Sequence, residues 1–161
     1  MNHKSAILFS ITALICSALF AGQIPVLAEK DIWVSDSIHL PPGLSACESM
    51  NAWCQAGIDA LSDNDDVNAL GYFNHALEFS DQCSDPEKKA DILVHLADIY
   101  YKANNYEKAL QFYISSIHYY AVEANTNKII RSLDDISNIY LDLKMYSNAL
   151  QGLYLSRKYY Q

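Results

Sequence analysis

An internal repeat with a period of 40 residues constrains the fold of this 161-residue chain more than any other feature. Small residues mark the period, and each is followed by another small residue 12 positions later. The first set is Gly57, Ala97 and Ser137, and the second is Ala69, Ala109 and Ala149. Such periods are typical of stacked units that bury apolar faces against each other, with about three units needed for a stable stack. The chain has three.

The middle unit shows most clearly what each repeat contains. Leu96, Ala97 and Tyr100 lie on one helical stripe. Asn104 and Asn105, which are suited to capping, interrupt this stripe, and a second stripe begins with Tyr106, Ala109, Leu110 and Tyr113. This order resembles the tetratricopeptide repeat, in a long-armed form of 40 residues. The resemblance implies an all-α fold, an α-solenoid of three antiparallel helical hairpins in a right-handed superhelix.

The repeat domain is expected to cover residues 45–161, with hairpins at about 45–83, 84–124 and 125–161. Ser45 and Glu48 have the form of a capping box, and Ser84 and Glu87 form a second candidate. The family's standard repeat has about 34 residues, so each unit here is longer by roughly six. Because the spacing of small residues within each unit is constant, the extra length is expected between hairpins.

Residues 1–28 have the pattern of a secretory signal peptide. Lys4 precedes an apolar run over 6–21, and Val26-Leu27-Ala28 places small residues at a cleavage site. Cleavage after Ala28 would send the protein to the bacterial periplasm or the medium and leave residues 29–44 as an extended lead-in. The alternative is an uncleaved anchor, because residues 6–28 are long enough to span a bilayer.

The cysteines fit an oxidising compartment. If the first hairpin turns near Asp65, Cys47 and Cys83 lie at equal distances from the turn, which predicts a disulfide between them. Cys54 is then left over, either as a small apolar residue or as a competing partner for Cys83. All thiols remaining free is the alternative, since sequence alone fixes no pairing.

Charge and motifs argue against several function classes. The formal net charge is −8, which disfavours nucleic acid and anionic membranes, so membrane contact is expected only through an uncleaved N-terminal segment. The histidines are isolated, and no zinc motif or glycine-rich phosphate loop is present, so no catalytic residue, cofactor or metal is expected. Asp63-Asn64-Asp65-Asp66 is better explained as a helix-capping turn than as a calcium loop.

The resemblance implies a concave groove along the first helix of each hairpin. Apolar at one end and mainly acidic at the other, the groove would suit a peptide or partner protein with basic and apolar residues. The alternative is a solvated face without a ligand. The expected groove residues are Ile58, Asp91, Val94, Asp98, Tyr101, Lys102, Arg131, Asp134 and Asn138.

The last hairpin is expected to leave an apolar flank at Leu150, Leu153 and Tyr154, because the extra capping helix common in this family is missing. That flank could serve self-association, be covered by the lead-in, or mark the chain as a fragment. The sequence thus predicts an exported, non-catalytic protein-interaction module. The alternative is the periplasmic sensory half of a larger signalling protein.

Overall fold

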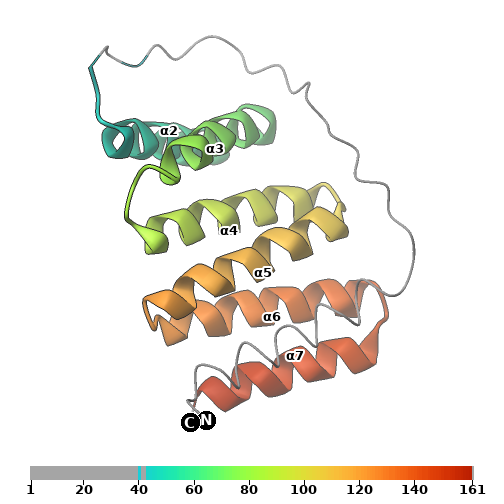
Figure 1. The fold of residues 1–161 in the computed structure, drawn as a ribbon. Helices are drawn as coiled ribbons and strands as arrows, with labels where there is room; N and C mark the ends of the chain where they lie inside the picture. The colour runs from blue at the N-terminus through green and yellow to red at the C-terminus, as the bar shows by residue number, and fades with distance from the viewer. Residues whose placement is uncertain (1–39, 41–42, 161) are drawn as a thin grey trace. The chain divides into compact units, whose positions relative to one another are not determined.

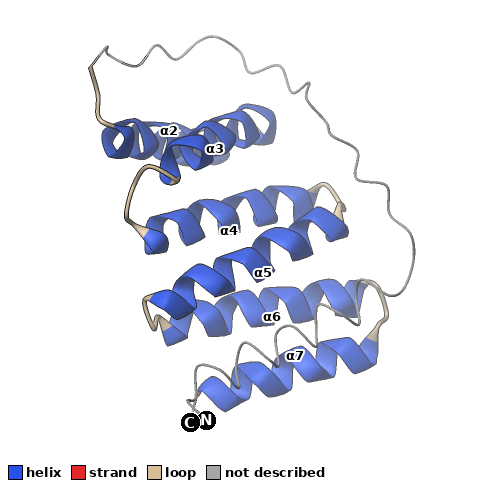
Figure 2. Cartoon of the chain, in the orientation of Figure 1, coloured by secondary structure: helices blue, strands red, loops and turns tan. Residues whose placement is uncertain are grey.

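The computed structural model of the chain describes residue 40 and residues 43–160. These residues form six α-helices and no β-strand (Figure 2). The helices are α2 (Ala46–Ser62), α3 (Asp66–Ser80), α4 (Pro86–Lys102), α5 (Tyr106–Val122), α6 (Thr126–Asp142) and α7 (Tyr146–Tyr159). The predicted all-α class is confirmed for the described residues. The predicted signal segment 1–28 and most of the lead-in 29–44 lie outside them.

The helices begin at intervals of 20 residues, half the period of the sequence repeat. The residue before each of the first five helices caps it, accepting a hydrogen bond on its side chain from the backbone N–H three residues later. These residues are Ser45, Asp65, Asp85, Asn105 and Asn125. Each such bond stabilises a helix start by about 1 kcal/mol. Met145, the sixth member of the series, makes no side-chain cap.

The start of α4 corrects one expectation. Its cap is Asp85, followed by Pro86 at the beginning of the helix, so the predicted capping box of Ser84 and Glu87 is wrong. The reason is the proline, which has no N–H to bond and suits the first helical position. The box predicted at Ser45 and Glu48 is confirmed, with both of its hydrogen bonds present.

Three-residue turns connect every pair of consecutive helices except α3 and α4. The middle residue of each turn adopts a left-handed conformation, with φ between 53° and 60°, which reverses the chain within a few residues. These middle residues are Asn64, Asn104, Ala124 and Lys144. The α5–α6 turn is therefore as short as the turns within hairpins. The expectation that the extra length lies between hairpins is wrong, since most helices themselves extend to 17 residues.

Consecutive helices lie side by side and antiparallel, in order from α2 to α7 (Figure 1). Packing is most extensive within the pairs α2–α3, α4–α5 and α6–α7, and less extensive between α5 and α6 or α3 and α4. The described chain is therefore a row of three helical hairpins in which each helix packs mainly on its sequence neighbours.

Small residues lie where the two helices of a hairpin approach closely. A Cβ atom at Gly57 on α2 would come within 2.8 Å of the Phe73 ring on α3, and a Cβ at Gly152 would collide with the Ser137 hydroxyl. Ala69, Ala97, Ala109 and Ala149 are almost completely buried. The predicted close packing at these positions is confirmed, because larger side chains would push the helices apart.

Cys47 and Cys83 lie at disulfide distance, with their Cα atoms 5.4 Å apart, as the sequence predicts. Cys47 is in the first turn of α2, and Cys83 lies in the five-residue connection between α3 and α4. The pair therefore links the start of the first hairpin to the point where the chain enters the second. Cys54 is a free, partly buried thiol.

Candidate functional site

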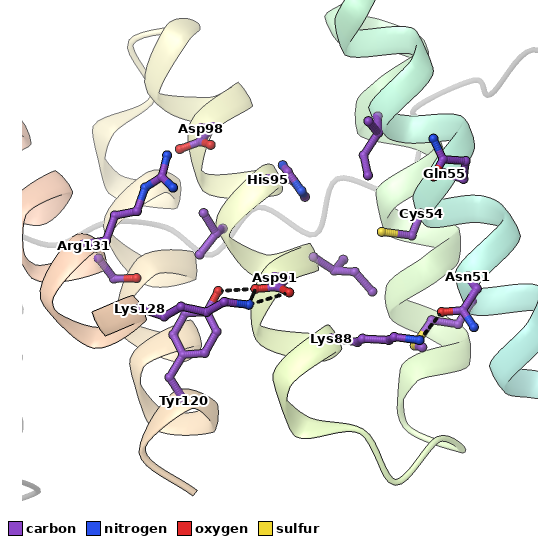
Figure 3. A pocket seen from close by; sticks show the side chains of 15 residues that line it. Asn51, Cys54, Gln55, Lys88, Asp91, His95, Asp98, Tyr120, Lys128 and Arg131 are labelled. Atoms are coloured by element: carbon purple, nitrogen blue, oxygen red, sulfur yellow. Dashed lines mark hydrogen bonds and ion pairs between the residues drawn. The ribbon is translucent and has the colours of Figure 1, made fainter. Parts of the chain in front are cut away.

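A cavity of about 540 Å³ opens across α2, α4 and α6, the first helices of the three hairpins. Figure 3 shows side chains of α2 on one side of the cavity and of α6 on the other, with α4 between them. Tyr120, near the end of α5, completes the wall. The cavity therefore spans all three repeats and depends on their stacking order.

The α2 side of the cavity is largely apolar. Met50 and Ile92 are buried in its floor, while Cys54 and Val94 are partly buried and Ile58 is 40% exposed. Burial raises the pKa of the Cys54 thiol, and the negative charge of Asp91 raises it further. At neutral pH the thiol is protonated and extends the apolar wall, which can accept an aliphatic or aromatic side chain.

A polar network around Asp91 divides the cavity in the middle. Lys128 on α6 donates hydrogen bonds to both carboxylate oxygens of Asp91 on α4, at 2.6 and 2.8 Å, and the Tyr120 hydroxyl donates to the same carboxylate at 2.6 Å. Lys128 also pairs with Glu87 at 2.9 Å. The charge of Asp91 is thus committed to holding α4, α5 and α6 together and is less available to a ligand.

Both donors of this network, Lys128 and Tyr120, have raised pKa values. Burial by itself lowers the pKa of Lys128, but the hydrogen bonds and charges of Asp91 and Glu87 outweigh that effect, so the net shift is upward. Burial raises the pKa of Tyr120, and its hydrogen bond to Asp91 raises it further. The lysine therefore stays charged, and the tyrosine stays protonated as a donor, throughout the physiological range.

A lysine makes the equivalent contact one repeat earlier, but its partner there is a neutral amide instead of a carboxylate. Lys88 and Asn51 each lie 40 residues before Lys128 and Asp91, and the Lys88 ammonium donates to the Asn51 side-chain oxygen at 2.8 Å. The neutral amide leaves the charge of Lys88 mostly uncompensated, with Asp85 3.8 Å away as its ion-pair partner. Lys88 therefore offers more charge to a ligand than Lys128 does.

His95 lies between the apolar wall and the charged end of the cavity. Its ring stacks on Phe73, with the centroids 4.8 Å apart. Burial lowers the pKa of His95, and this effect outweighs the opposing influence of Asp98 and Asp91. The imidazole is consequently neutral at pH 7 and can act as a hydrogen-bond donor or acceptor for a ligand.

Carboxylates gather near the α6 side. Asp98 accepts a hydrogen bond from the Tyr113 hydroxyl. Asp135, half-buried on α6, has its pKa raised to about 6, first by burial and then by the negative charge of Asp98; Arg131 opposes the shift and Asp134 adds to it. Of Asp98 and Asp135 only Asp98 lines the cavity, and α6 itself contributes Lys128 and Arg131 to the lining, so a cationic group of a ligand would be favoured at Asp98.

The structure brings together five of the predicted groove residues. Ile58, Asp91, Val94, Asp98 and Arg131 line the cavity.

The other four predicted groove residues lie outside its lining. Tyr101 donates to Asp142 at 2.7 Å, and Lys102 donates to Asp66 at 3.1 Å, so both side chains connect neighbouring elements. Asp134 is partly exposed and Asn138 exposed, both farther along α6.

Several lining residues were missed by the sequence analysis, among them Lys88, His95, Tyr120 and Lys128. Lys88 and Lys128 carried a usable signal, because equal residues 40 positions apart occupy equal places in successive repeats. Tyr120 carried none, since it lies at the end of a second helix and reaches the cavity only through its long side chain.

Among the described residues, no group of histidine, cysteine or carboxylate side chains is arranged to hold a metal ion. In the same part of the chain, no helix is long and apolar enough to cross a membrane.

Comparison with known proteins adds no assignment to this geometry. No protein-family model matches the chain, and no curated protein matches it either.

Proposed function

We propose that this chain is a tetratricopeptide-like α-solenoid that binds a segment of another protein in the cavity across α2, α4 and α6, without catalysis. The proposal is supported by the 40-residue register of small residues, the antiparallel helix pairs and the three-residue turns. Stacked hairpins of this kind present their first helices along one continuous surface, which suits extended or helical peptides.

The observation that carries the proposal is the placement of the cavity. It is lined by equivalent faces of three successive hairpins, and its chemistry changes from apolar at α2 to charged at α6. A peptide is the class of ligand that spans such a length and offers both kinds of contact. Its bulky apolar residue would lie against Ile58 and Val94, and a lysine or arginine farther along would approach Asp98.

The protein is further proposed to work in the periplasm or outside the cell. The signal-like pattern of residues 1–28 supports export, and so does the placement of Cys47 and Cys83 at disulfide distance. Disulfides persist in oxidising compartments and are rare in the cytosol. Mass spectrometry of the native protein tests this directly, with an N-terminus at Glu29 and a bridged Cys47–Cys83 peptide as the expected result.

The binding proposal is tested by selecting a phage-displayed library of short random peptides against the purified protein. We expect enriched peptides to combine a bulky apolar residue with a lysine or arginine. Ile58→Glu should weaken their binding at least about ten-fold, because it places a charge against the apolar anchor. Asp98→Asn should weaken only peptides with the basic residue, since asparagine keeps an oxygen for Tyr113.

The matched control is Val122→Glu, which places the same charge at an exposed valine on α5, outside the cavity. Its affinity for the peptides should equal that of the wild type. Asp91 is unsuitable for such a test, because its loss would also break the contacts with Lys128 and Tyr120. The proposal fails if no peptide is enriched, or if enriched peptides bind the Ile58→Glu variant as well as the wild type.

A further inference from the structure

The outward side of α7 carries exposed apolar side chains in helical register. Tyr146, Leu150, Leu153 and Tyr154 are 66%, 69%, 44% and 68% exposed, and their spacing places them on one side of the helix. We call these four residues the α7 row. Single exposed apolar residues are normal in proteins, but a contiguous row of four large ones marks an interaction surface.

The repeat register shows what kind of surface this is. Leu110, Tyr113 and Ile114 lie 40 residues before Leu150, Leu153 and Tyr154, on α5. These residues are buried or half-buried, and α5 packs against α6. The α7 row is thus the counterpart of residues that, one repeat earlier, are shielded within a stack of helices, and no described residue shields it.

We propose that the α7 row joins two copies of this chain across a two-fold axis, with the two α7 helices packed antiparallel. A two-fold contact needs only one self-complementary patch, which the row provides. Tyr146 and Tyr154, each about two-thirds exposed, offer on the order of 200–300 Å² together. With the two leucines and both copies counted, the apolar area approaches the ~1,000 Å² of a small, reversible interface.

Charge supports a second copy as the occupant. The chain has a formal net charge of −8, so most faces of two copies repel each other. Within the described chain α7 is the one helix that contains no aspartate or glutamate, and it carries Arg157 and Lys158. An α7–α7 contact therefore brings two copies together where the repulsion between carboxylates is smallest.

A head-to-tail arrangement, with the α7 row on α2 of the next copy, fits less well. Most exposed side chains of α2 are polar, and Gln55 donates a hydrogen bond to the exposed Asp59 at 2.9 Å. Burying them against leucine and tyrosine side chains would remove water from polar groups without replacing its hydrogen bonds. The contact is therefore closed, and it gives dimers rather than filaments.

The antiparallel arrangement makes specific pairs. With the crossing point between Leu150 and Leu153, Leu150 of one copy faces Tyr154 of the second copy. Arg157 then lies near Tyr146 of the second copy, where a guanidinium can stack on the aromatic ring. Each favourable pair occurs twice, once on each side of the axis.

Analytical ultracentrifugation of the purified protein over a concentration series tests the proposal. The wild type should shift from monomer to dimer with rising concentration and form no larger species. Leu150→Lys and Tyr154→Glu should each dimerise at least about ten-fold more weakly. Mixing the two variants should restore a heterodimer, because the new lysine and glutamate face each other across the axis.

Val122→Glu, a charge at an exposed apolar position on α5, is the matched control and should dimerise like the wild type. Circular dichroism of each variant shows that its helices are intact. A wild type that remains monomeric at the highest concentration overturns the proposal, whatever else covers the row. Growth into larger assemblies, or full dimerisation of Leu150→Lys, overturns it as well.

Discussion

The α3–α4 and α5–α6 connections both join successive hairpins, but they differ in length and in the contacts that hold them. Between α5 and α6 the chain turns in three residues through Ala124, while Asn125 and Lys128 both reach Glu87 on α4. Between α3 and α4 the connection takes five residues, α3 is two residues shorter than the other helices of the first two hairpins, and these two helices pack less extensively.

The longer connection has its own covalent and ionic attachments. It contains Cys83, placed to bond with Cys47, and Asp81, which pairs with Lys89 of α4. A stack of hairpins can thus hold the next hairpin in place either by a short turn of fixed conformation or by a cross-link around a longer connection. Mutations should therefore have different consequences at the two connections.

The largest effect is expected at the α3–α4 connection. Replacing both Cys47 and Cys83 by alanine should lower the free energy of unfolding by about 2–4 kcal/mol, because a disulfide closing a loop of 36 residues removes much of the unfolded chain's entropy. Urea unfolding without reductant measures the change. Cys54→Ala is the control and should cost about 1 kcal/mol at most, since it removes only one partly buried sulfur. Equal unfolding midpoints for wild type and double variant would contradict the cross-link.

A second effect concerns the carboxylates between α4 and α6. The pKa of Asp135 is raised to about 6 from a value near 3.8 in the unfolded chain. The folded state therefore holds the proton more tightly, and stability falls as the pH rises between about 4 and 6. After allowance for its partial exposure, we expect Asp135→Asn to stabilise the protein by about 1–2 kcal/mol at pH 7 and to have almost no effect at pH 4.

Urea unfolding of both proteins across pH 4–8 measures this difference. One repeat earlier, the positions equivalent to Asp98 and Asp135 are Ile58 and His95, so no two carboxylates face each other there. The position equivalent to Asp135 in the first repeat is the neutral Gln55. Gln55→Ala is therefore expected to show no pH-dependent difference. A stability gain for Asp135→Asn that is the same at pH 4 and pH 7 would rule out the titration of this group as the cause.

A third effect compares the two equivalent lysines. Lys128→Met should cost about 1 kcal/mol, because it leaves Asp91 and Glu87 without their cation at a partly buried site. Lys88→Met should cost less than ~0.5 kcal/mol, since its main partner is a neutral amide. Thermal unfolding at low and high salt measures both. Equal losses of stability in the two variants would show that the Asp91 network adds nothing to the packing of α6 against α4.

The smallest effect concerns the α5–α6 turn. Ala124 has φ 53°, a conformation that costs a residue with a Cβ about 1 kcal/mol and costs glycine little. Ala124→Gly should therefore stabilise the protein by about 0.5 kcal/mol after the greater entropy of unfolded glycine is subtracted. Ala103→Gly is the control with φ −76° and should destabilise by a similar amount. If Ala124→Gly and Ala103→Gly shift the thermal midpoint in the same direction, the strain assigned to Ala124 is contradicted.

The sequence predicted the helical hairpins because the relevant signals are local. Small residues at a constant spacing, capping residues and helical stripes are read from the chain. The symmetry of a hairpin about Asp65 favours the pairing of Cys47 with Cys83, which the structure places at disulfide distance. The α5–α6 turn was not foreseen, because alanine has no preference for the left-handed conformation that Ala124 adopts. Its conformation is set by the packing of the helices on both sides.

The candidate site was predicted in part for a similar reason. Helical periodicity places Asp91, Val94 and Asp98 on one face of α4, and the structure brings them to the cavity. Helical periodicity does not tell how far a long side chain reaches. Tyr101 and Lys102 are engaged with Asp142 and Asp66, while Lys128 crosses to Asp91 from the next hairpin. Such partners depend on the distance between helices, which the sequence leaves open.

The cross-link at the first hairpin also determines the end of the molecule from which local unfolding starts. Each helix packs mainly on its two neighbours, so helices can detach one at a time from an unsecured side. The α2–α3 pair is held by the cysteines, whereas α7 starts at Met145 without a side-chain cap and packs on α6 through one face only. In the monomer, amide hydrogens should therefore exchange fastest in α7 and progressively more slowly toward α4, and reducing the disulfide should flatten this gradient.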